Sequence, residues 1–307
     1  MTNDANIASI DAVTDSRQNQ ILALSQTDEA ERAALSAAAS AGVEMREVVS
    51  HADLQAVYAL YADIWRPDPT NPPVTTEMLR ALTKAGNYVV AAFDGHELLG
   101  ACVGFFGAPA GAELHSHIAG VAAAARGRDI GFALKLHQRA WAMRRGISAV
   151  TWTYDPLVRR NAHFNLVKLA ATPTEYLPNF YGGMHDGING SDDSDRLLVT
   201  WHLRSPAVAA ACAGIVAPPA KASASDVAAL GISADAPVPG RLDGSTLTIA
   251  VPADIERLRA TDPALALAWR PAVRTAMHGL MARGARVTGF DHDRGYVLTT
   301  IQNGHIA

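Results

Sequence analysis

Residues 113–145 join a strand, a loop of Gly and Arg residues and a helix without interruption. Glu113–Ala122 has the pattern of a strand, the loop reads Arg126-Gly-Arg-Asp-Ile-Gly131, and Phe132–Arg145 has a helical pattern closed by Gly146. Such a unit directs several backbone N–H groups and the positive end of a helix dipole toward one point, where a diphosphate can bind. The loop lacks the Gly-Lys-Ser/Thr ending of a Walker loop and the Gly-x-Gly-x-x-Gly dinucleotide fingerprint.

The patterns on both sides of this unit predict an α/β (α+β) fold with a mixed, mostly antiparallel central sheet flanked by helices. Ser50 is expected to cap the first helix, and Asp94-Gly95-His96 is expected to turn a hairpin, because Gly tolerates positive φ. The expected strands are 43–49, 88–93, 98–106, 113–122, 148–155 and 196–203, and the expected helices are 50–64, 75–85, 132–145 and 159–170.

Three further regions flank or follow this domain, which spans 43–204. Residues 1–42 have helical propensity but a weak apolar stripe, which indicates a helical extension. Residues 205–244 are rich in Ala, Pro, Ser and Gly and are expected to be a linker or a poorly packed crossing. Residues 245–307 predict a smaller C-terminal α/β subdomain with a strand at 246–251, helices at 254–260 and 263–283, and a hairpin over 286–301.

Composition excludes several classes of protein. The chain has 307 residues, 49% of them hydrophobic, which is enough apolar material for a core. A net charge of -4 argues against nucleic-acid binding by phosphate neutralisation. Two cysteines exclude a disulfide framework and a four-thiolate zinc site, so a cytoplasmic location is expected. No run is long and apolar enough to span a membrane, and the first residues lack the order of a secretory signal.

The loop resembles the acyl-CoA-binding motif of the GNAT superfamily of N-acyltransferases, Arg/Gln-x-x-Gly-x-Gly/Ala after the fourth strand. Two registers fit. Arg126–Gly131 has the usual spacing from Val121 but places Asp129 at the middle glycine, whereas Arg128–Ala133 satisfies the pattern literally. The first register is preferred. The resemblance implies that Val121 and the loop residues Arg126, Gly127, Arg128, Asp129, Ile130 and Gly131 bind the pyrophosphate of acetyl-CoA or another acyl-CoA.

The resemblance covers Val43–Leu203, about half of the chain, and extends to a large GNAT subgroup with an added C-terminal region. The segments that carry it are Leu114–His117, Thr151–Leu157, Asn161–Asn165, Tyr176–Gly182 and Asp195-Arg196. It implies a sheet whose fourth and fifth strands splay apart and hold the pantetheine arm between them, with Asn161 and Asn165 as hydrogen-bond partners of that arm. Helix capping is the alternative role for the two asparagines.

Candidate proton-transfer groups lie on the fourth and fifth strands. His115 and His117 share one face by the two-residue period of a strand, and imidazole titrates near neutrality, so His117 is the candidate general base with His115 behind it. A His-x-His pair occupies this place in arylalkylamine-acetylating members. Metal binding and a structural role are the alternatives; no third ligand is evident, so no metal is expected.

The general acid is less well defined. Matching Lys168-Leu169-Ala170 to the usual Lys-Leu-Gly of the superfamily puts Leu166 where many members have a tyrosine, so Tyr154 or Tyr181 would have to substitute. The resemblance thus predicts an acyl-CoA-dependent N-acyltransferase acting on a small-molecule amine, with an amino acid as one candidate acceptor.

Charged residues beside the expected acceptor cleft would suit a carboxylate-bearing acceptor: Asp155, Arg159, Arg160, Asp195 and Arg196. The rival hypothesis is a GNAT-shaped protein that binds CoA or an acidic small molecule without turnover. Acetyl or succinyl as the acyl group, a homodimer, and the C-terminal subdomain as a second half, a lid or a dimer surface are left open.

Overall fold

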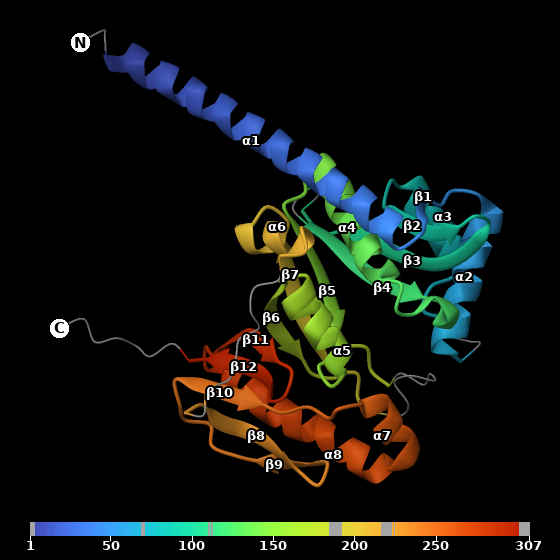
Figure 1. Cartoon of the computed structure of the whole chain (residues 1–307), viewed down its shortest axis with the longest axis vertical. Coiled ribbons are helices and arrows are strands. Elements are labelled where there is room, and N and C mark those ends of the chain that lie inside the picture. The colour runs from blue at the N-terminus through green and yellow to red at the C-terminus, as the bar shows by residue number, and fades with distance from the viewer. Residues whose placement is uncertain are drawn as a thin grey trace.

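A computed structural model describes residues 4–68, 71–109, 111, 113–183, 192–215, 223 and 225–300, with only the backbone for 4–17, 19 and 20. The described chain contains two sheets, one of seven strands and one of five. Figure 1 shows the larger sheet with its helices above the smaller one, and α1 projecting from the larger unit. The expected mixed α/β fold with a smaller C-terminal unit is confirmed.

The seven-stranded sheet has the order β1-β2-β3-β4-β5-β7-β6, in which only β4 and β5 are parallel neighbours. Its strands are β1 (Glu44–Glu47), β2 (Tyr88–Asp94), β3 (Glu97–Phe106), β4 (Glu113–Val121), β5 (Ala149–Tyr154), β6 (Thr172–Leu177) and β7 (Arg196–His202). The hairpin of β2 and β3 turns at Gly95, whose φ of 59° is the reason for a glycine there. Edge strand β6 was not expected: Pro173 and a register shift beside it obscure the strand pattern.

Helices cover both faces of this sheet. On one face, α2 (His51–Trp65) and α3 (Thr76–Lys84) bury Leu54, Val57 and Leu79 in one cluster with residues of β2 and β3. Ser50 caps α2 as predicted by accepting a hydrogen bond from the Asp53 N–H. On the other face, α4 (Ile130–Arg144) packs on β2, β3 and β4. The helix after β5 consists of α5 (Arg159–Ala162) and a π-helical turn, His163–Lys168.

The expected parting of the fourth and fifth strands is present. Strands β4 and β5 pair only at Glu113–Ala149, Leu114–Val150 and His115–Thr151, although β4 continues to Val121 and β5 to Tyr154. The β3–β4 register shifts between Val103 and Gly104 and leaves His117 opposite no residue of β3, so β4 bulges two residues beyond its last pair with β5. The backbone of β4 after His115 therefore faces a gap where a neighbouring strand would otherwise lie.

Ahead of the larger sheet lies one long helix, α1 (Asp4–Ser40). Its last turns pack on α4 through Ala30, Ala34 and Ala38, whose small side chains let the two helices approach closely. Arg204 also donates a hydrogen bond to the carbonyl of Ala23. The described part of the chain has no helix that is long and apolar enough to cross a membrane.

The smaller sheet has the order β11-β12-β10-β8-β9. Its strands are β8 (Val227–Ser233), β9 (Ala236–Pro239), β10 (Thr246–Ile249), β11 (Arg286–Asp291) and β12 (Gly295–Thr299), and its helices are α7 (Ile255–Thr261), α8 (Pro263–Val273), a π-helical turn (Arg274–His278) and α9 (Gly279–Ala282). The strand at 246 and the final hairpin agree with expectation.

The stretch 205–244 is more than a linker. It contains α6 (Pro206–Cys212), capped by Ser205, as well as β8 and β9. Strand β8 pairs in parallel with β10, so it is an internal strand of the second sheet. Its Ala and Gly residues gave no strand signal because these residues have low strand propensity, and pairing with β10 decides the conformation instead.

Candidate functional site

The loop between β4 and α4 presents an uncapped helix N-terminus. Helix α4 begins at Ile130, and no side chain caps it. The first intrahelical bond from this end is the Ala133 N–H to the Asp129 carbonyl, so the preceding N–H groups of the first turn, including that of Gly131, have no acceptor in the helix. A Cβ added at Gly131 would lie 3.9 Å from Val121 Cγ2, which puts the helix start beside the end of β4. This arrangement can bind an anion.

Backbone angles favour the register Arg126–Gly131. Asp129, at the middle glycine of the motif, has a φ of 56°, in the left-handed region that glycine adopts without strain. Ala170, at the glycine of the Lys-Leu-Gly match, likewise has a φ of 53°. Asp129 and Ala170 thus keep a glycine-like backbone without being glycine.

The charged side chains of the loop point in different directions. The Asp129 carboxylate accepts a hydrogen bond from Lys168 Nζ at 2.8 Å, and it makes no cap to α4. Arg128 donates to the carbonyls of Ala41 and Gly42 and to Asp94, which engages its guanidinium at the end of α1 and the β2–β3 turn. The Arg128 guanidinium therefore already has three acceptors within the chain. Arg126 is exposed.

The two histidines of β4 lie together beside β5. Their ring centroids are 6.4 Å apart, and both rings pack against Phe105. His115 Nδ1 lies 3.2 Å from Thr151 Oγ1 on β5. Burial, with the charges of His117 and Lys135, lowers the pKa of His115 to about 4. Desolvation lowers the pKa of His117, against a hydrogen bond with the Pro73 carbonyl that raises it. Both imidazoles are therefore neutral at pH 7, as a base requires.

The two tyrosines proposed as acids have different surroundings. Tyr154 is buried, and its hydroxyl lies 3.3 Å from that of Tyr296 in the second unit. Burial raises the pKa of Tyr154. Side chains alternate along a strand, so Tyr154 lies on the face of β5 opposite to Thr151 and Thr153. Tyr181 lies 3.1 Å from Thr153 Oγ1, on the same face as His115, and is half exposed. The geometry separates Tyr154 from the histidines, and only Tyr181 shares their face.

The two asparagines after β5 also differ. Asn165 is buried and accepts a hydrogen bond from Trp152 Nε1 at 3.1 Å. Asn161 is half-buried in the first turn of α5, and its N–H bonds to the Val158 carbonyl. In this arrangement Asn165 holds the Trp152 ring, and Asn161 takes part in the start of the helix.

A buried lysine lies where β4 and β5 part, and the sequence did not single it out. Lys135 of α4 places Nζ 2.9 Å from Ser116 Oγ, 3.1 Å from Gln138 Oε1 and 3.7 Å from the centre of the Trp152 ring. Ser116 and Trp152 directly follow the last paired residues of β4 and β5. Burial lowers the pKa of Lys135 to about 8. The available signal was a lysine between the apolar residues Leu134 and Leu136, three residues before a glutamine.

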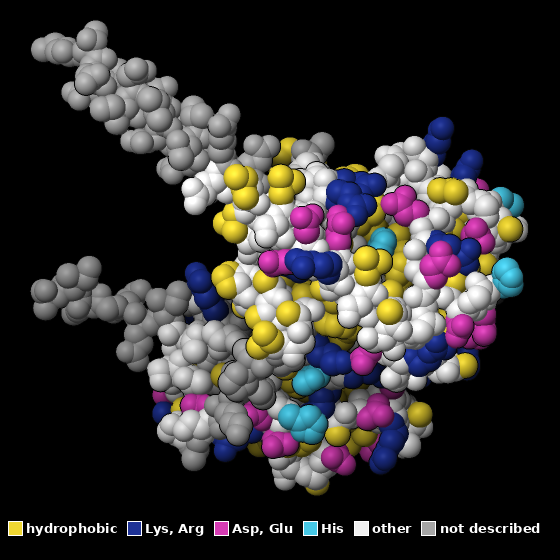
Figure 2. All heavy atoms as spheres, turned by 45° about the horizontal axis from the view of Figure 1, so that its top comes forward, with side chains coloured by type: hydrophobic (Ala, Val, Ile, Leu, Met, Phe, Trp, Pro, Cys, Tyr) yellow, Lys and Arg dark blue, Asp and Glu magenta, His cyan; other side chains and the backbone are white. Residues whose placement is uncertain are grey.

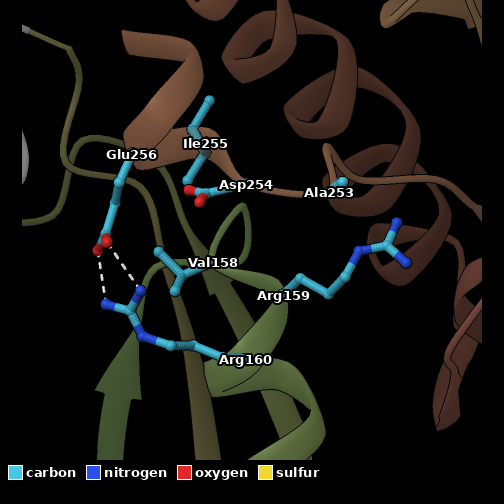
Figure 3. Close-up of a pocket in the computed structure, with 7 residues that line it drawn as sticks. All are labelled: Val158, Arg159, Arg160, Ala253, Asp254, Ile255 and Glu256. Atoms are coloured by element: carbon cyan, nitrogen blue, oxygen red, sulfur yellow. Dashed lines mark hydrogen bonds and ion pairs between the residues drawn. The ribbon is translucent and has the colours of Figure 1, made fainter. Parts of the chain in front are cut away.

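The charges after β5 bind the second unit, which corrects their expected place beside an acceptor. Asp155 accepts from Arg270 at 2.7 and 2.9 Å, and Arg274 donates to Asp195. A pocket of about 160 Å³ lies between the units. Figure 3 shows its lining residues, among which Arg160 pairs with Glu256. Arg159 donates to the carbonyls of Val251, Pro252 and His292. The cations of this pocket are Arg159 and Arg160, and both already have protein partners. The pocket is therefore poorly suited to bind the carboxylate of an acceptor.

The described residues bear on two further kinds of site, a metal site and, on one face, a basic surface. No three His, Cys, Asp or Glu side chains within the described ranges gather as metal ligands. On the face shown in Figure 2, acidic and basic side chains are interspersed among the described residues.

No family profile matches the chain, and no curated protein sequence matches it. The solved structures that match it include acetyltransferases. One is a ribosomal-protein-S18-alanine N-acetyltransferase from Escherichia coli, with 10% identity, a TM-score of 0.42, and coverage of 53% of this chain and 95% of that chain. Another is a putative acetyltransferase from Salmonella typhimurium with its cofactor acetyl-CoA, with 17% identity, a TM-score of 0.43, and coverage of 58% of this chain and 99% of that chain.

A third match is an aminoglycoside 6'-N-acetyltransferase complexed with coenzyme A, with 16% identity, a TM-score of 0.41, and coverage of 53% of this chain and 98% of that chain. These matches cover about half of this chain, which leaves an extra region. Because the three TM-scores are below 0.5, we rest the function proposed below on the geometry of the chain itself.

Proposed function

We propose that the chain is an acyl-CoA-dependent N-acyltransferase that acylates a small-molecule amine by direct transfer in a ternary complex. The observation that supports this most is the parting of β4 and β5 beside the uncapped N-terminus of α4. Domain 43–204 would carry the reaction. The opened strands offer unpaired backbone groups to an extended amide-bearing arm, as a sheet edge does, and the helix start offers N–H groups to a diphosphate.

His117 would remove the proton from the attacking amine. Its bulged position after His115 lies on the α2 and α3 face of the sheet, where Tyr181 and Thr153 also lie. The amine nitrogen bonds to the acyl carbon, and backbone N–H groups of β4 toward Val121 stabilise the oxyanion that develops. Collapse of this intermediate breaks the carbon–sulfur bond and leaves the electron pair on sulfur.

The groups on the α2 and α3 face of the sheet indicate the chemical class of the acceptor. Neutral histidines and hydroxyl groups suit an amine, which must lose its proton before it attacks. An amino acid acceptor would need a cation for its carboxylate. Arg196, whose guanidinium lies 5.3 Å from the centre of the Tyr181 ring and donates to the Asp195 carbonyl, is a candidate.

A screen of acyl-CoA donors against amines, read by the release of free CoA thiol, tests the proposal. Acetyl-CoA and succinyl-CoA should each be offered to amino acids, arylalkylamines and polyamines, with free CoA and no-amine reactions as controls. We expect amine-dependent thiol release with at least one pair. Binding of CoA with no release for any pair would favour the rival hypothesis, a GNAT-shaped protein that binds CoA without turnover.

A further inference from the structure

Lys135 is a buried cation without a carboxylate beside it. Its side chain is enclosed by β3, β4, β5 and its own helix, and within the described chain the contacts of Nζ are two neutral oxygens and one aromatic face. An ammonium in such a place costs several kcal/mol unless something compensates it. A well-packed apolar residue would fill the same space without that cost, so a role beyond packing has to be sought.

The position of Lys135 coincides with the point where the two central strands separate. His115 and Thr151 are the last paired residues, and Ser116 and Trp152, the next residue on each strand, both contact Nζ. Further along β4, Ala119 is exposed although it lies inside a sheet strand, so the gap opens outward from the ammonium. Ser116, the first residue of β4 beyond the last pair, is therefore the residue beside which a group held at the apex of the gap would lie.

The two faces of the sheet carry complementary groups at this apex. His115 and His117 lie on the face of α2 and α3, and Lys135 approaches Ser116 from α4 on the other face. An acyl carbon between the strands would thus meet a base on one side and a proton donor on the other. Direct transfer uses both groups, because the amine has to lose a proton and the departing thiolate has to gain one.

We propose that Lys135, through the hydroxyl of Ser116, supplies the proton that the departing thiolate takes up. This rests on the proposed acyltransferase function. When the carbon–sulfur bond breaks, Ser116 gives its proton to sulfur and receives one from Lys135, which regains it from water. The proton of the amine leaves through His117, so atoms and charges balance. Lys135 would also stabilise the thiolate before proton transfer.

The neighbouring titratable groups fit this role. Cys102 on β3 lies 3.6 Å from Ser116 Oγ and accepts from Gln138, and burial raises its pKa, so it stays a neutral thiol. His115 on β4 is neutral at pH 7, and Trp152 of β5 does not titrate. A Lys135 pKa of about 8 leaves the ammonium mostly protonated at pH 7 and able to give up its proton.

The pKa of bound CoA thiol tests the proposal without turnover. Ultraviolet thiolate absorbance is measured as a difference with and without saturating CoA across pH, for the wild type, Lys135→Met and the exposed control Lys84→Met. We expect the pKa of the bound thiol to be lower in the wild type and in Lys84→Met than in Lys135→Met by about one unit or more. Equal thiol pKa values in all three would overturn the proposal.

Kinetics provide the second arm. Lys135→Met and Ser116→Ala should retain acyl-CoA affinity within about threefold, while kcat falls by about 10²-fold or more. Lys135→Arg keeps the charge but holds its proton, so its kcat should fall nearly as far. The wild type should lose rate above about pH 8, where Lys135 loses its proton, and Lys135→Arg should not. A wild-type kcat in Lys135→Met would remove Lys135 from the reaction while leaving the acyltransferase intact. No CoA binding by the wild type would overturn both proposals.

Discussion

The carboxylate of Asp129 turns away from the helix that it precedes and accepts a hydrogen bond from Lys168 Nζ at 2.8 Å. This ion pair joins the loop after β4 to the helix after β5, on either side of the gap between those strands. A carboxylate at the start of α4 would repel a diphosphate, but its pairing with Lys168 draws the charge aside. The pair is partly exposed, so its effect is on binding more than on stability.

Removal of the Asp129 charge should strengthen CoA binding. Asp129→Asn removes the charge and tolerates the positive φ, and Asp129→Gly also relieves the left-handed strain of about 1–2 kcal/mol. We expect a lower Kd for CoA in both variants and a higher free energy of unfolding in Asp129→Gly alone, by calorimetry and denaturant titration. Lys168→Met should weaken binding, and Asp129→Asn should restore it in the double variant. Weaker binding in Asp129→Asn would mean that the carboxylate contacts the ligand favourably.

Gly131 should matter for CoA binding and not for folding. An added Cβ meets nothing closer than Val121 Cγ2 at 3.9 Å, and its φ is not in the left-handed region. Gly131→Ala should therefore leave the free energy of unfolding unchanged or raise it by up to about 1 kcal/mol. The same Cβ would stand between the α4 N–H groups and a phosphate, so the Kd for CoA should rise. Gly279→Ala, in a helix of the second unit, is the control. Unchanged CoA affinity in Gly131→Ala would place the phosphates elsewhere.

His117→Ala should reduce kcat/KM by about 10²- to 10⁴-fold, as loss of a general base does. Because the pKa of His117 is lowered, its neutral form persists to a pH below the ordinary histidine value, so the acid limb of kcat/KM should lie below about pH 6.5. The limb should be lost in the variant. His96→Ala, in the exposed β2–β3 turn, should change neither quantity. An intact rate and limb in His117→Ala would show that another group is the base.

Tyr154 and Tyr181 should respond differently to loss of the hydroxyl. Tyr154→Phe removes a buried contact with Tyr296, so the free energy of unfolding should fall by about 1 kcal/mol while KM for the amine is unchanged. Tyr181→Phe should leave stability unchanged and raise KM for the amine, because its hydroxyl lies on the acceptor face. Steady-state kinetics and urea denaturation separate the two. A kinetic defect confined to Tyr154→Phe would contradict this assignment of faces.

Arg270 should be required for attachment of the second unit. Arg270→Met leaves Asp155 buried with reduced pairing, which should lower the free energy of unfolding by about 3 kcal/mol or more. The partly exposed pair of Arg160 and Glu256 should contribute about 1 kcal/mol or less, so Arg160→Met is the control. Similar losses in the two variants would show that burial of the Asp155 pair has no special weight.

The same pair predicts a pH dependence of stability. Burial alone would raise the pKa of Asp155, but hydrogen bonds and charge from Arg270, with Arg259, lower it to about 2. A lowered carboxyl pKa stabilises the folded state above the ordinary value of about 4, and this contribution is lost as pH falls from about 4 to 2. The wild type should show that loss in acid titrations, and Arg270→Met should show less of it.

Local signals in the sequence predicted the elements that they determine. The Ser50 cap, the turn at Gly95 and the loop before α4 each depend on a few adjacent residues, and all three are present. Strands β6 and β8 were not predicted, because an edge strand with Pro173 and an Ala-rich strand are fixed by pairing with β7 and β10.

In the candidate site, too, the sequence predicted what depends on local pattern and not what depends on distant parts of the chain. Period-2 geometry predicted that His115 and His117 lie together, whereas the burial of Tyr154 and the pairing of Asp155 depend on a second unit more than a hundred residues further along the chain. Lys135 was missed because a single lysine in a helix is usually exposed, and only the packing of β4, β5 and α4 encloses it.

Calorimetric titration of the wild type with CoA, acetyl-CoA and pantetheine tests the central claim most directly. If the helix start binds the diphosphate and the parted strands hold the arm, CoA and acetyl-CoA should bind with one-to-one stoichiometry, and pantetheine, which lacks the diphosphate, should bind much more weakly. Absence of heat for CoA at millimolar concentration, or equal affinity for pantetheine and CoA, would contradict the account.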